Sequence, residues 1–215
     1  MGDHELGKRS LFGGEGGMRL SSWHRATREL GLDPFWKLSV GRSVLIGITS
    51  SLVALPAYLP ETLIGEREEW GRLRAQHLGE IGDAFGNLQP REHVVLFCHD
   101  PTALPFLWRE NRVRSKASQI ALTVIGHLHS RLFLWQSRLL SGMPTVSVFG
   151  YSIQRMSAAL REARYWRPFN VRLCPALAGI QLLNDGGYCR LGIQPQTRPH
   201  FSFHRLGRKE AVCKC

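Results

Sequence analysis

The sequence lacks a hydrophobic run long enough to cross a membrane. Its longest uncharged apolar stretch, SVLIGITSSLVALPAYL (43–59), has 17 residues and contains Ser, Thr and Pro56, whereas a spanning helix needs about 20 predominantly apolar residues. We interpret this stretch as a buried strand followed by a loop. The opening MGDHELGKRS also lacks the basic start and apolar segment of a secretory signal. We therefore expect a cytoplasmic protein with no membrane span.

Cysteine and acidic residues are scarce. The five cysteines, an odd number without framework spacing, argue against a disulfide scaffold and agree with a reducing compartment. Asp and Glu number 17 against 28 Lys and Arg, which gives a formal net charge of +11. This charge favours an anionic partner. Nucleic acid is a possible partner, but the arginines are scattered and no nucleic-acid motif is recognisable, so a small anionic substrate is favoured.

The length and composition fit one domain with a sizeable core, because the chain has 215 residues of which 43% are hydrophobic. We expect a single domain over residues 1–205 and a tail over 206–215. The tail contains CKC, which could bind metal or form a disulfide, although an unstructured end is the simpler interpretation.

Apolar runs alternate with helical patterns along the chain, which is typical of α/β layering. Helical spacing of Trp70, Leu73, His77 and Ile81 predicts an amphipathic helix within 66–85. The other predicted segments are strands at 42–51, 93–99 and 120–129, a helix at 102–113, short strands within 145–152, 171–177 and 189–195, and a helix at 152–166.

Histidines follow two of the predicted buried strands. His99 ends HVVLFCH, and His127 and His129 follow Gly126 in TVIGHLH. In open α/β sheets, ligands bind at the carboxyl ends of the strands. His99 alone could be a capping or core histidine bonded to backbone. Two more imidazoles after a glycine favour a metal site, because neutral imidazole is a common ligand of transition metals.

The opening GDHE supplies a third polar group. Asp3, His4 and Glu5 place a possible metal ligand, a proton donor and a carboxylate able to orient that donor in consecutive positions. In isolation, the same residues are better explained as the solvated start of a chain.

In their order, G-D-H-E, a strand-ending His and G-H-x-H resemble the last three motifs of the calcineurin-like metallophosphoesterases. That family's pattern runs Asp-x-His, Gly-Asp-x-x-Asp, Gly-Asn-His-Asp/Glu, His, Gly-His-x-His. The resemblance extends from Gly2 to about residue 195, since GGYCRLGIQP is similar to the family's closing strands. It implies a layered α/β fold with two packed sheets and flanking helices.

The resemblance also implies roles for individual residues. Asp3 stands where the family has a metal-binding asparagine, and His4 where a histidine contacts substrate and assists the leaving group. Glu5 matches the following acidic residue. His99 and His127 would bind the second of two divalent ions (Mn, Fe or Zn), and His129 the first. We therefore expect the three histidines to converge, with Asp3 near them.

The family's first two motifs are missing from this sequence. No Asp-x-His occurs, and the only Gly-Asp besides Gly2-Asp3 is Gly82-Asp83, on a predicted helix. The missing motifs would supply the aspartate that bridges both ions. We therefore expect an N-terminally truncated metallophosphoesterase whose first strands are missing, with an incomplete site for hydrolysing phosphate monoesters or diesters. Its exposed sheet edge would favour self-association.

Two other interpretations remain open. The chain could be a non-catalytic binding module that uses its basic surface to hold an anionic partner such as nucleic acid. Alternatively, His99, His127 and His129 could form a purely structural zinc site.

Overall fold

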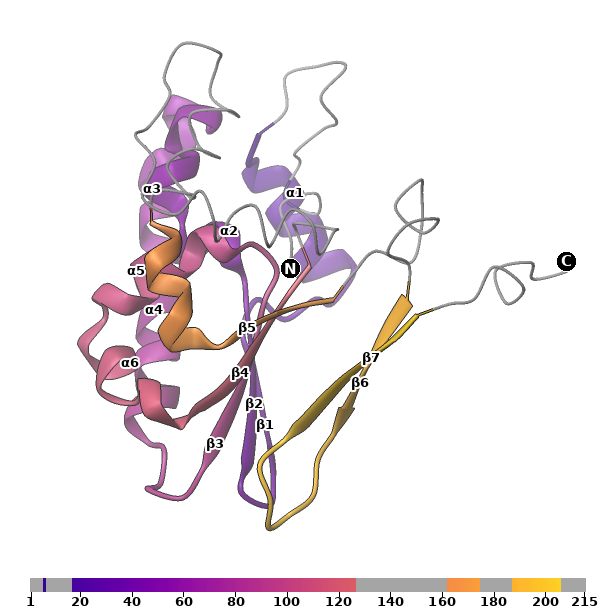
Figure 1. Ribbon diagram of the computed structural model, residues 1–215. Helices are drawn as coiled ribbons and strands as arrows, with labels where there is room; N and C mark the ends of the chain where they lie inside the picture. The colour runs from indigo at the N-terminus through magenta and orange to yellow at the C-terminus, as the bar shows by residue number, and fades with distance from the viewer. Residues whose placement is uncertain (1–5, 7–16, 127–161, 175–186, 206–215) are drawn as a thin grey trace, which may run out of the picture.

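The computed structural model describes residues 6, 17–126, 162–174 and 187–205, and the description below is of these residues (Figure 1). They form an α/β arrangement with two sheets. The strands are β1 (Trp36–Val40), β2 (Ser43–Ile48), β3 (His93–Cys98), β4 (Ile120–Ile125), β5 (Val171–Leu173), β6 (Gly187–Gly192) and β7 (His200–Arg205). The α-helices are α1 (Leu20–His24), α2 (Ser50–Val53), α3 (Leu55–Tyr58), α4 (Arg67–Gly86), α5 (Leu104–Arg109) and α6 (Asn111–Ser115). The π-helix η1 spans Arg25–Glu29. The 3-10 helices are η2 (Leu59–Glu61), η3 (Ile64–Glu66), η4 (Pro101–Ala103), η5 (Ala117–Gln119) and η6 (Ala163–Phe169).

The larger sheet has the order β1-β2-β3-β4-β5. Strands β2 to β5 run parallel, and β1 pairs antiparallel with β2 at one edge. The helices α2 to α6 lie in the chain between parallel strands, which need long crossover connections. The α/β expectation and the predicted central strands are therefore confirmed.

Strands β2 and β3 are nearly continuous apolar runs because both faces of the sheet are covered there. One face packs on the helical layer, which contains α2, α4, α5 and α6 (Figure 1). Ile46 and Leu96 on this face, and Trp70 and Ile81 of α4, are fully buried in one core cluster. The spacing from which this helix was predicted therefore identifies the face of α4 that is buried.

The smaller sheet is the antiparallel pair β6–β7, which lies on the side of the larger sheet away from α4 to α6 (Figure 1). The Arg42 N–H donates to the Pro195 carbonyl at 3.1 Å. Near the other end of the hairpin, the Cys189 thiol lies 3.7 Å from the Leu173 carbonyl. Two sheets with flanking helices agree with the expected architecture at that level.

Several local predictions were wrong or incomplete. The segment after β2, expected to be a loop, contains α2 and α3. Pro56 does not prevent α3 because it occupies the first turn of that helix, where its missing N–H costs nothing. Strand β1 was not predicted. The helix expected at 102–113 is two short helices, separated by the extended Glu110.

Of the helix predicted at 152–166, only residues 162–166 fall within the described part, and there the chain forms the 3-10 helix η6. The predicted strand at 145–152 lies outside the described residues. None of the helices in the described ranges combines the length and the apolar character needed to cross a membrane.

Candidate functional site

The carboxyl ends of the parallel strands meet at one edge of the larger sheet. Ile48 of β2 is the register partner of Cys98 in β3, and Ile125 of β4 is the partner of Leu173 in β5. In α/β folds, the loops that follow such strand ends form the ligand site. His99 and Gly126 are the first residues beyond β3 and β4, so both lie at this edge.

His99 and Gly126 are in direct contact. The Gly126 N–H donates to the His99 carbonyl at 3.1 Å, which fixes the end of β4 beside the end of β3. A methyl group added at Gly126 would lie 3.2 Å from Nδ1 of His99. Glycine therefore leaves room for the half-buried His99 imidazole against the backbone of the neighbouring strand.

A pocket of about 310 Å³ adjoins His99 on the sheet face opposite the helices. Trp36 and Phe97 form an aromatic part of its wall, with ring centroids 5.4 Å apart. The Trp36 indole occupies the space above Gly47, where an added Cβ would be 2.1 Å from Nε1. The pocket thus combines an apolar floor with one imidazole, a combination that suits a small organic ligand with a polar group.

The turn after His99 is held by a buried carboxylate. Asp100, 2% exposed, accepts the Thr102 N–H at 2.8 Å through Oδ1 and the Tyr58 hydroxyl through Oδ2. The Asp100 N–H donates to Ser50 Oγ at 3.1 Å. These bonds tie the turn to α2, α3 and η4. The backbone next to His99 is consequently fixed by hydrogen bonds to three other residues.

Cys98 lies beside this carboxylate and is poorly suited to metal binding. Burial, followed by the negative charge of Asp100, raises the pKa of the Cys98 thiol. Its Sγ also lies 3.3 Å from the Asp100 carbonyl. Because the thiolate is the form that binds metals, a protonated Cys98 leaves His99 as the better ligand at this strand end.

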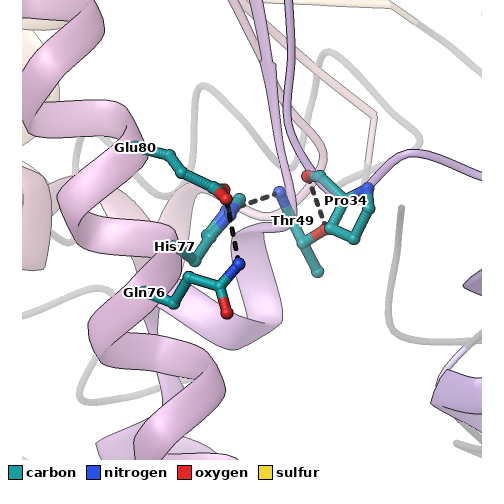
Figure 2. Close-up of polar contacts among 5 residues, drawn as sticks. All are labelled: Pro34, Thr49, Gln76, His77 and Glu80. Atoms are coloured by element: carbon teal, nitrogen blue, oxygen red, sulfur yellow. Dashed lines mark hydrogen bonds and ion pairs between the residues drawn. The ribbon is translucent and has the colours of Figure 1, made fainter.

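A second histidine, His77 of α4, supports the end of β2 from within the core (Figure 2). Its Nε2 accepts the Thr49 N–H at 3.1 Å, and Thr49 Oγ1 donates to the Pro34 carbonyl at 2.9 Å. Glu80 Oε2 lies 3.7 Å from Nδ1 of His77. Burial lowers the pKa of His77 to about 4, so the ring is neutral near pH 7. His77 therefore acts as a structural acceptor, a role that the sequence did not reveal.

Of the predicted site residues, the structure describes the position of one. His99 lies at the expected strand end, whereas Asp3, His4, Glu5, His127 and His129 lie outside the described residues. Within the described ranges, no group of three or more His, Cys, Asp or Glu side chains is arranged to hold a metal ion. The expected convergence of the three histidines therefore stays a prediction. The chain matches no protein-family model, no curated protein and no solved structure.

Proposed function

We propose that the carboxyl edge of the parallel sheet is part of a metal-dependent phosphoesterase site. The observation that carries this proposal is the hydrogen bond between the Gly126 N–H and the His99 carbonyl. It holds one potential imidazole ligand beside the strand that continues into the sequence Gly126-His127-Leu128-His129. Imidazoles from neighbouring strand ends are a common way to assemble a transition-metal site.

Divalent ions such as Mn, Fe or Zn would lower the pKa of a bound water and neutralise the phosphate oxygens of the substrate. In this proposal, Asp3, His99, His127 and His129 bind metal. His4 holds a proton near the departing oxygen, and Glu5 orients His4. The apolar floor formed by Trp36 and Phe97 would contact the organic part of the ester.

In the family that the sequence resembles, the Asp-x-His and Gly-Asp-x-x-Asp motifs supply the aspartate that bridges the two ions. The sequence has no Asp-x-His. Asp100, which follows His99 in the chain, already accepts hydrogen bonds from Thr102 and Tyr58. We therefore expect this chain to bind at most about one divalent ion tightly and to hydrolyse esters slowly, because two close cations need a shared anionic ligand.

Metal content and hydrolysis of an aryl phosphate ester, measured on His99→Ala, test the proposal. Loss of a direct ligand should reduce metal affinity and hydrolysis by at least about tenfold, since even outer-shell changes cost that much. His93→Ala is the matched control. His93 is a half-buried histidine at the opposite end of the same strand, and its replacement should leave both measurements near the wild-type values.

The same measurements separate the alternatives. Bound zinc without hydrolysis would favour a structural zinc site. Neither metal nor hydrolysis would reject the phosphoesterase proposal and favour a non-catalytic binding module. Equal effects of the His99 and His93 substitutions would show that the carboxyl edge has no specific role in metal binding or hydrolysis.

A further inference from the structure

The hairpin β6–β7 has two chemically different sides. Its register places Tyr188 opposite His204, Arg190 opposite Ser202 and Gly192 opposite His200 on one side. The tyrosine, the arginine and both histidines are exposed, with 49% of Tyr188 accessible to solvent. The alternating positions are half-buried and mainly apolar: Cys189, Leu191, Phe201 and Phe203. The hairpin thus presents a polar, aromatic outer face.

Two aromatic rings on the outer face stack against one another and form a pair that we call the aromatic platform. The rings of Tyr188 and His204 are stacked, with centroids 5.1 Å apart and an interplanar angle of 13°. Ser202 Oγ lies 3.0 Å from Nε2 of His204, which fixes the orientation of the imidazole. Exposed aromatic rings of this kind stack with the faces of unpaired nucleic-acid bases.

The charge of the hairpin complements a polyanion. Residues 187–205 contain Arg190, Arg198 and Arg205 but no Asp or Glu. At the connecting loop, Arg198 lies close enough to His93 to help lower the pKa of that histidine, as does Arg42, after the larger effect of burial. Arg190 lies on the outer face, two positions along β6 from Tyr188, where it can neutralise a phosphate next to a stacked base, whereas Arg205 pairs with Gly187 among the alternating positions of the other face.

We propose that the outer face of β6–β7 binds single-stranded nucleic acid. An unpaired base stacks on the Tyr188–His204 platform, and the adjacent backbone phosphate contacts Arg190. Duplexes are disfavoured because their bases are already stacked and cannot lie on the rings. This binding requires no metal, so it is independent of the proposed phosphoesterase site.

The proposal is tested with the full chain in a metal chelator, by fluorescence anisotropy of a labelled oligothymidylate and of a duplex of equal length. Tyr188→Ala should weaken single-strand binding by about tenfold, because stacking contributes about 1–3 kcal/mol per base and about 1.4 kcal/mol corresponds to tenfold. Tyr188→Phe should retain binding. Arg190→Ala should weaken binding and reduce the salt slope by about 0.7, the value for one phosphate contact on a single strand.

Arg28→Ala is the matched charge control, since Arg28 is an exposed arginine on η1 and the substitution changes net charge equally. It should leave affinity near the wild-type value. The proposal is overturned if Arg28→Ala and Arg190→Ala weaken binding equally. It is also overturned if the duplex or anionic phospholipid vesicles bind as tightly as the single strand.

A further measurement uses the wild-type chain and so does not depend on the folding of any variant. Photocrosslinking of an oligonucleotide containing 5-bromodeoxyuridine, followed by mass spectrometry, should label the peptide that contains Tyr188. Crosslinks found only in other peptides would overturn the proposal.

Discussion

His77 shows how a single side chain can serve the sheet edge without touching a ligand. Thr49 ends the backbone pairing of β2, and its N–H would be buried without an acceptor if the His77 Nε2 were absent. An unsatisfied buried amide costs about 1–3 kcal/mol, so His77 contributes to the stability of the strand end. Its position on α4 follows from helical spacing, but its partner depends on tertiary packing.

We predict that stability falls with decreasing pH because of His77. Its pKa is about 4 in the folded chain, below the usual value of 6.5, so the unfolded chain binds a proton more readily. The stability that depends on neutral His77 is therefore fully present above pH 6.5 and is lost as pH falls toward 4. The full loss is about 3 kcal/mol, from about 1.36 kcal/mol per pKa unit. Urea unfolding between pH 7 and 4 measures it.

His77→Gln is the control for this prediction. A glutamine amide oxygen can accept the Thr49 N–H but does not titrate, so the variant should lose less stability than the wild type across the same pH range. Parallel pH profiles for the two proteins would contradict the assignment of this effect to His77.

At the level of elements, the β1–β2 turn links the two sheets. Gly41, at φ +57°, is the first residue of a two-residue turn, and glycine is preferred at this position of a hairpin. A Cβ on Gly41 would lie 2.5 Å from Pro195 Cα, on the loop between β6 and β7. The turn and that loop therefore pack backbone against backbone.

Gly41→Ala should be strongly destabilising for two reasons. A left-handed alanine costs about 1–2 kcal/mol, and overpacking against Pro195 should add about 1–3 kcal/mol. Gly31→Ala is the matched control, because Gly31 has φ +63° but no atom within 4 Å of an added Cβ. Chemical denaturation of both variants measures the difference. Equal losses would show that the loop between β6 and β7 does not pack on the turn.

The elements differ in how far the sequence predicts them. Strands β2, β3 and β4 are short apolar runs rich in β-branched residues, and local composition identifies such runs. Strand β1 was missed because WKLSV is short and its five residues are all exposed, so its identity depends on pairing with β2. The alternation of Trp36, Leu38 and Val40, followed by Gly41, is the signal that could have predicted the hairpin.

The candidate site was predictable to a similar degree. A histidine at the end of an apolar run places His99 at the carboxyl edge, because parallel strands share that edge. The pocket floor was not predictable, since Trp36 meets Phe97 only after β1 pairs with β2. The hydrogen bonds of Asp100 with Tyr58 and Ser50 likewise join segments about 40 to 50 residues apart.

At the scale of the whole molecule, the exposed edge of the larger sheet is the surface through which we expect the chain to self-associate. Trp36, Leu38 and Val40 project from one face of edge strand β1 and are 39%, 54% and 37% exposed. An exposed apolar edge strand favours pairing with another chain. The β1 edge is therefore the surface to which we assign the self-association expected from the sequence.

We predict that the chain self-associates through the β1 edge and that Leu38→Lys weakens this association. A lysine on an edge strand disfavours strand-to-strand pairing, because its charge would be buried between the chains. Ile64→Lys is the control, since Ile64 is 80% exposed but lies in the short helix η3. Sedimentation velocity over a range of concentrations should show smaller species for Leu38→Lys and wild-type behaviour for Ile64→Lys. A wild-type chain that sediments as a monomer at every concentration would contradict self-association. Equal effects of the two substitutions would indicate a general gain in solubility from added charge, without a role for the β1 edge.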